Sequence, residues 1–73
     1  MERQEWLRRV ASELGVAAPE DEEIELLLAL AGIAAHSSER TAAPLTCWLV
    51  GRVGLELEAA LALVKRLAAE SES

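Results

Sequence analysis

Hydrophobic residues recur along this chain at spacings of three and four, which is the periodicity of an α-helix with one apolar face. The first such segment covers residues 2–14, and its apolar positions are Trp6, Leu7, Val10, Ala11 and Leu14. Gly15 follows at the position where a left-handed residue commonly ends a helix. We therefore expect a first helix over residues 2–14. Because the chain contains no Phe or Tyr, its core should be built from aliphatic residues and the two tryptophans.

The second segment, residues 19–36, begins with Pro19 and continues with a run of carboxylates. Proline loses no hydrogen bond at the first helical position, and the helix dipole stabilises negative charge near an N-terminus. The dipole is thus a sufficient reason for an acidic run that otherwise suggests a metal site. After Glu25 the segment is apolar on every side, which is typical of a helix that the others surround. Gly32, in its interior, indicates a close approach by another helix.

Two further helices complete the pattern, over residues 42–53 and 55–70. We expect Thr41 to cap the first of them by accepting a hydrogen bond from the amide of Ala43. That helix carries apolar residues on two faces, one of which contains Trp48, so it should contact neighbours on two sides. The fourth helix has a single apolar face. The pattern therefore predicts an all-α fold, a compact bundle of four short helices.

Length and composition limit the ways in which such a bundle can be stabilised. The 73 residues allow a single domain, residues 1–73, and a chain of this size buries only about 60% of its unfolded surface. Small domains are therefore often stabilised by a disulfide, a metal, association or very regular helix packing. Cys47 is the single cysteine and His36 the single histidine, so an internal disulfide is excluded and a zinc site is disfavoured. Helix packing and association remain.

Charge and hydropathy argue against two classes of partner. The formal net charge is −6, with 13 acidic against 7 basic residues, so the chain should repel phosphate backbones and have no nucleic-acid partner. The longest apolar run, Leu26–Ala35, is far shorter than the roughly 20 residues that span a bilayer, and we expect no membrane partner. The first residues lack the basic and apolar regions of a signal peptide. These features predict a cytoplasmic protein.

Several polar chemistries meet in one segment, residues 35–46, between the second and third helices. It contains His36, Arg40, Thr41 and Thr46. A structural interpretation is that the cations complement the dipole at a helix C-terminus and the hydroxyls bond to the backbone. A functional interpretation is that these four side chains and the free amides of a helix N-terminus bind an anion. The functional interpretation predicts a site for a phosphorylated small molecule or for an anionic group of a partner protein.

A catalytic role is disfavoured by the surroundings of the single thiol. Cys47, with His36 upstream, offers a nucleophile and a base. The cysteine lies inside an apolar helix beside Trp48, however, and a buried structural thiol is the commoner outcome there. Packed helices of this length also leave little room for a cleft. We therefore expect no catalytic residue, no cofactor and no metal site.

The string Ala-His-x-x-x-Arg-x-Ala-Ala-Pro-Leu-Thr-x-x-Leu-x-Gly runs from Ala35 to Gly51. In this string and its surroundings, residues 24–54, the chain resembles an uncharacterised small bacterial helical domain. That domain occurs alone or fused to the molybdenum cofactor guanylyltransferase, which makes molybdopterin-guanine dinucleotide. The chain departs from the family in having Gly32 and Ile33 where polar residues are expected. It also has Cys47-Trp48 in place of a threonine followed by Phe or Tyr.

The resemblance implies a non-catalytic accessory or interaction domain in molybdenum cofactor maturation. The transferase itself would need a nucleotide-binding α/β domain with a glycine-rich loop, which is not seen in these residues. Two functions therefore compete. The first is a protein-interaction module that binds a partner protein, or itself as a homodimer, through the helix face that contains Trp48. The second is a domain that binds a phosphorylated cofactor at the polar residues His36, Arg40, Thr41 and Thr46.

Overall fold

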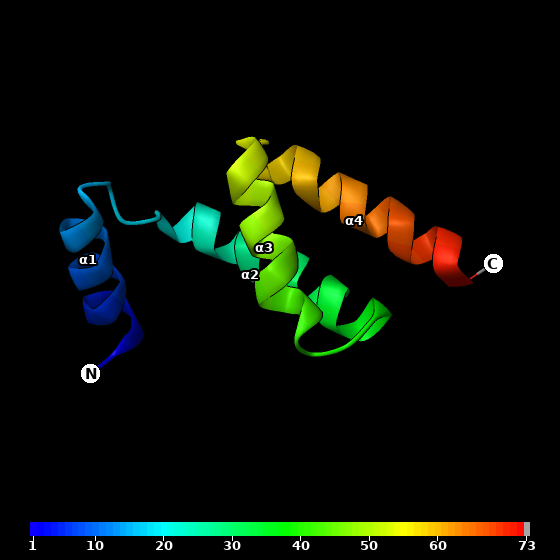
Figure 1. Cartoon of the computed structure of the whole chain (residues 1–73), viewed down its shortest axis with the longest axis horizontal. Coiled ribbons are helices and arrows are strands. Elements are labelled where there is room, and N and C mark those ends of the chain that lie inside the picture. The colour runs from blue at the N-terminus through cyan, green and yellow to red at the C-terminus, as the bar shows by residue number, and fades with distance from the viewer. Residues whose placement is uncertain (73) are drawn as a thin grey trace.

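The structure is a computed structural model that describes residues 1–72, which form four α-helices (Figure 1). The helices are α1 (Arg3–Leu14), α2 (Asp21–Ser37), α3 (Ala42–Val53) and α4 (Leu57–Glu72). No strand occurs within residues 1–72. The all-α bundle of four helices predicted from the hydrophobic pattern is therefore confirmed. Among the described residues, no helix combines the length and the apolar character that a bilayer crossing requires.

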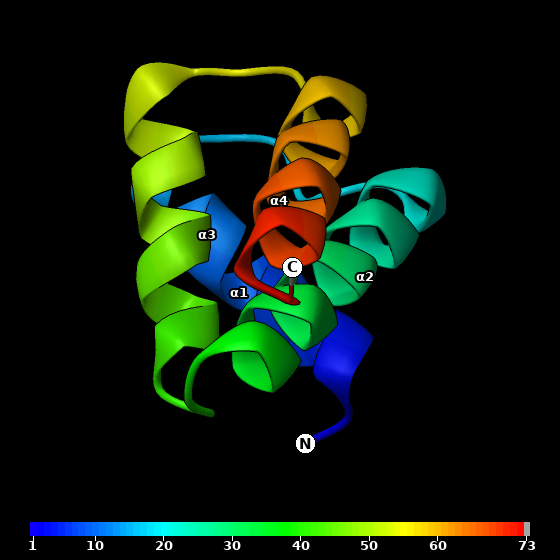
Figure 2. The same ribbon diagram turned by 90° about the vertical axis from the view of Figure 1, so that its right-hand side faces the viewer.

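Helix α2 is central to the packing because it contacts both α3 and α4. In Figure 2, α3 stands to the left of α4, and α2 lies to the right of α4 and below it. The three helices meet in one cluster of buried side chains, Leu30 from α2, Val50 from α3 and Ala60 from α4. Leu30 and Ala60 are fully buried. Burial of a leucine side chain stabilises a fold by roughly 1.5–3 kcal/mol, so this cluster is a major source of stability. Helix α2 is nevertheless not covered on every side, since Leu28 is 57% exposed.

Local capping determines where α2 begins. The sequence predicts a start at Pro19, but the helix starts at Asp21 and Glu20 is its N-cap residue in an extended conformation. The amide of Glu20 donates a hydrogen bond of 2.8 Å to Oε1 of Glu23, which is one half of a capping box. The acidic run is thus explained by the helix dipole, as the sequence suggested, and also by a capping box that was not predicted.

Two glycines end helices in the left-handed conformation that favours glycine. Gly15, with φ of 73°, ends α1, and Gly54, with φ of 75°, ends α3. After α1 the amide of Gly15 donates to the carbonyl of Ser12 at 3.2 Å, and the amide of Val16 donates to Ala11 at 3.0 Å. This pair of bonds is a Schellman motif, and it determines the direction in which the chain leaves α1.

Helix α1 lies at one end of the molecule and projects away from α2, α3 and α4 (Figure 1). Ala11 is its single buried residue, whereas Trp6 is 57% and Leu14 is 71% exposed. Trp48, on α3, is 59% exposed. The expectation that both tryptophans belong to the core is therefore wrong. Periodicity identifies an apolar face, but it does not show whether the same chain covers that face.

Substitution of Leu30 by alanine should destabilise the fold by about 2–5 kcal/mol, because it removes buried methyl groups and leaves a cavity among three helices. Urea unfolding followed by far-UV circular dichroism measures this change. Leu28→Ala is the matched control, since Leu28 is exposed on the same helix, and it should shift stability by no more than roughly 0.5 kcal/mol. Equal losses from the two variants would contradict the assignment of Leu30 to the core.

Gly32 does not mark a close approach between helices, so that expectation is also wrong. A Cβ atom placed on Gly32 would meet no atom of a neighbouring element within 4 Å. Alanine is a better helix former than glycine by about 1 kcal/mol in a helix interior. Gly32→Ala should therefore raise the midpoint of urea unfolding. A loss of stability would show that the glycine provides space that another helix or a partner needs.

Candidate functional site

The residues of the predicted polar site lie at the junction of α2 and α3. His36 is exposed in the last turn of α2, and Arg40 and Thr41 are exposed in the connection that follows. Thr46 lies one turn into α3 and is half-buried. In residues 1–72, no side-chain hydrogen bond or ion pair involves any of the four. The structure therefore places them in one region without joining their side chains.

Thr41 does not cap α3 with its hydroxyl, which corrects the sequence expectation. An N-cap residue normally has an extended backbone, which aims its side chain at the amides of the first turn. Thr41 instead has helical angles, φ of −71° and ψ of −13°, and its side chain makes no capping bond. The first amides of α3 are used by backbone carbonyls: Ala42 donates to Glu39 at 2.9 Å and Ala43 donates to Arg40 at 3.3 Å.

The hydrogen bonds of this turn, between residues 39 and 43, argue against an anion site at the N-terminus of α3. An anion site at a helix N-terminus depends on backbone amides that have no other acceptor. The amides of Ala42 and Ala43 have acceptors, and Pro44 has no amide hydrogen. The first three residues of α3 therefore offer no free backbone donor, and an anion would depend on exposed side chains, namely His36, Arg40 and the hydroxyl of Thr41.

Thr46 lines a groove that the sequence did not reveal. The groove has a volume of about 380 Å³ and lies between the C-terminal parts of α2 and α4 and the side of α3 that carries Thr46 and Val50, with Leu49 at its border. Its walls are mainly apolar, with hydroxyl groups among them, and the apolar side chains include Ile33, Leu49, Leu63, Val64 and Leu67. Such a lining suits an apolar group better than a phosphate. Three helices contribute to it, so no local sequence pattern could have predicted it.

The outer side of α3 carries a continuous row of large apolar side chains, which we call the α3 stripe. The stripe consists of Leu45, Trp48, Leu49 and Val53, which are 65%, 59%, 57% and 76% exposed, respectively. Spacings of three and four place these residues on one side of the helix. The guanidinium carbon of Arg52 lies 5.2 Å from the ring centroid of Trp48, a cation–π contact that helps to hold the ring in place.

The two predicted faces of α3 thus have different environments. Val50 is buried, and Cys47 is half-buried and packs against the core cluster of α2, α3 and α4. The face with Trp48, predicted to contact a second neighbour, is instead open to solvent. Cys47 thus lies at the edge of the core, half-buried, where the sequence suggested a buried thiol.

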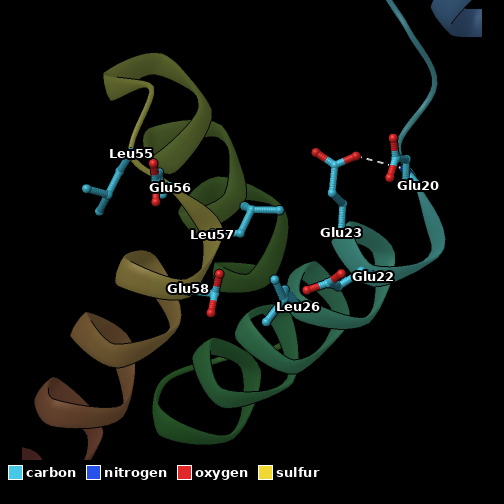
Figure 3. Close-up of a pocket in the computed structure, with 8 residues that line it drawn as sticks. All are labelled: Glu20, Glu22, Glu23, Leu26, Leu55, Glu56, Leu57 and Glu58. Atoms are coloured by element: carbon cyan, nitrogen blue, oxygen red, sulfur yellow. Dashed lines mark hydrogen bonds between the residues drawn. The ribbon is translucent and has the colours of Figure 1, made fainter.

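A second groove, of about 340 Å³, lies between the first turns of α2 and α4 (Figure 3). Leucines 26, 55 and 57 form its apolar part, and five glutamates surround them: Glu20, Glu22, Glu23, Glu56 and Glu58. Carboxylates at the start of two helices are favourable on dipole grounds alone. Within residues 1–72, no three His, Cys, Asp or Glu side chains are grouped so that they could hold a metal ion. The groove therefore needs no ligand to explain it.

The four helices and the exposed α3 stripe define a small all-α domain with an apolar helix face on its surface. Its sequence matches, over residues 1–73, a family described as a domain of unknown function, DUF6457, and the chain belongs to that family. No curated protein and no solved structure matches the chain. The expectation of an uncharacterised helical domain is confirmed at this level.

Inorganic phosphate provides a direct test of the anion hypothesis. Because the first amides of α3 already donate to carbonyls, we expect millimolar phosphate to leave the ring signals of His36 unchanged in NMR spectra recorded at constant pH. Sodium chloride at equal ionic strength is the control. A saturable shift of these signals that disappears in Arg40→Ala would instead establish a side-chain anion site at this junction.

Proposed function

We propose that this chain is a non-catalytic protein-interaction domain whose binding surface is the α3 stripe. The observation that carries the proposal is the exposure of four large apolar side chains along one helix, each between 57% and 76%. Scattered exposed apolar residues are normal in proteins, but a contiguous apolar patch is typical of an interaction site. Burial of such side chains against a partner supplies the free energy of binding.

The residue types of the stripe also support binding. Tryptophan and arginine are enriched among the residues that dominate binding energies, and here they lie side by side as Trp48 and Arg52. The contact between them restricts the ring before any partner arrives. A side chain that is already ordered loses less entropy on binding, so more of the burial energy contributes to affinity.

We further propose that the partner acts in the cytoplasmic maturation of the molybdenum cofactor. The support is the resemblance of the Ala35–Gly51 string to the domain found with the molybdenum cofactor guanylyltransferase. Leu45 and Leu49 belong both to that string and to the α3 stripe. Trp48 takes a position at which that family is expected to have another aromatic residue. Two of the shared positions, Leu45 and Leu49, therefore lie on the surface that we assign to binding.

Purified guanylyltransferase is the probe for this function. We expect the wild-type chain to bind it and Trp48→Ala to weaken binding at least about tenfold, as measured by isothermal titration calorimetry, because truncation of a hot-spot tryptophan costs about 2 kcal/mol or more. Leu49→Ala should also weaken binding.

Leu28→Ala provides a matched control for Leu49→Ala, since both leucines are 57% exposed and Leu28 lies outside the stripe. Binding that is equally tight in Trp48→Ala, Leu49→Ala and the wild-type chain would reject the stripe as the surface. A wild-type chain that does not bind the guanylyltransferase would reject this enzyme as the partner.

A further inference from the structure

The molecule exposes more surface than its mass requires. Its accessible surface is 5739 Å² for 7.9 kDa, whereas a compact monomer of this mass exposes about 4,400 Å² by the usual scaling. The excess, about 1,300 Å², is larger than the roughly 800 Å² that each partner buries in a standard protein–protein interface. The projection of α1 from the other helices accounts for the elongated shape of 43 × 23 × 19 Å (Figure 1).

Helix α1 carries an unpartnered apolar face of its own, which we call the α1 face. It consists of Trp6, Val10 and Leu14, and these residues line a shallow groove together with Met1, Arg9 and Glu13. Isolated helices of about 12 residues are marginally stable in water, so α1 should need a packing partner. The α1 face is the right kind of surface for such a contact, because its apolar residues follow helical spacing.

The α3 stripe matches the α1 face in length and presents no carboxylate to it. Both helices contain 12 residues and are therefore about 18 Å long. Arg52 is the single charged residue of α3, so no carboxylate on that helix would repel Glu13 at the border of the α1 face. Apolar side chains would meet along the centre of such a pair. At its edge, Arg52 is opposite in charge to Glu13 and like in charge to Arg9, so the apolar contact is the main source of binding energy.

Helix α1 of a second copy can cover the α3 stripe, whereas α1 of the same chain points away from it (Figure 1). The Schellman motif after α1 and the restricted backbone before Pro19 direct α1 away from α3 of its own chain (Figure 1). Each copy carries one α1 face and one α3 stripe. A single twofold axis therefore allows two copies to cover all four surfaces, which is the isologous arrangement that most homodimers adopt.

We propose that the protein forms a symmetric homodimer in which α1 of each copy packs its face on the α3 stripe of the other copy. This inference rests on the proposed function, because it uses the same stripe and names a second copy as one of its occupants. The homodimer and the complex with a different partner then compete for one surface. Binding of that partner requires release of α1 of the second copy.

Sedimentation velocity of the full chain tests the dimer. We expect a wild-type species near twice 7.9 kDa, and at least about tenfold weaker dimerisation in both Trp6→Ala and Trp48→Ala. Leu28→Ala is the control and should dimerise as the wild-type chain does. Circular dichroism checks that each variant keeps its helices. Trp6→Ala does not touch the core of α2, α3 and α4, so loss of the dimer in that variant does not reflect loss of that core.

A mixture of the two tryptophan variants identifies the contact itself. In a heterodimer of Trp6→Ala and Trp48→Ala, one contact between α1 and α3 is intact and the other carries both substitutions. Effects of substitutions in one contact are not additive, so the heterodimer should form above its statistical share. Native mass spectrometry with one variant isotopically labelled measures that share. A purely statistical share would overturn the pairing of α1 with α3.

Two outcomes separate this inference from the proposed function. A wild-type chain that sediments as a monomer at high concentration overturns the homodimer, whereas the effect of Trp48→Ala on guanylyltransferase binding still decides the proposed function. A dimer that is lost in Trp48→Ala and kept in Trp6→Ala overturns α1 as the occupant and supports the stripe as a binding surface. In the expected case, Trp6→Ala binds the guanylyltransferase more tightly than the wild-type chain does, because the competing contact is weakened.

Discussion

The arrangement of this protein depends on the packing of α2 against both α3 and α4 through Leu30, Val50 and Ala60. The side chain of Ala60 is small, which lets α4 approach α2 closely over the fully buried Leu30. A cluster of this size uses one side of α3 and leaves the other side without a partner within the chain. The exposed α3 stripe is thus a consequence of how small the core is, and it is the feature on which the proposed function depends.

The sequence predicts the helices well, because their signals are local. Apolar spacing and the glycines at positions 15 and 54 act within one or two turns of the backbone. The capping box at Glu20, which was not predicted, moves the start of α2 from Pro19 to Asp21. The solvent exposure of the two tryptophans, in contrast, was not predicted. Trp6 and Trp48 have the spacing of core residues, yet both are more than half exposed. Periodicity is the same whether a face is covered by its own chain or by another molecule, so sequence alone does not separate the two cases.

The sequence predicted where the four polar residues lie, but it did not predict which hydrogen bonds form around them. His36, Arg40, Thr41 and Thr46 do lie at one helix junction, because a short connection keeps them together. The cap by Thr41 depended on a backbone torsion that residue type does not determine. In the tight turn before α3, the amides of Ala42 and Ala43 donate to backbone carbonyls. The hydroxyl of Thr41 therefore does not cap the helix. The groove beside Thr46 depends on three helices and has no local signal.

The distribution of charge is consistent with association through α3 despite the net charge of −6. Two copies of a strongly acidic chain repel one another, and the repulsion is largest where carboxylates face each other. Five glutamates line the groove between the first turns of α2 and α4 (Figure 3), whereas α3 contains no acidic residue. Contacts along the α3 stripe therefore bury apolar surface without desolvating a carboxylate of α3, and salt screens the more distant glutamates. Because the apolar stripe is separate from the acidic groove, a second molecule that bound there, as we propose, would meet little electrostatic repulsion from this chain.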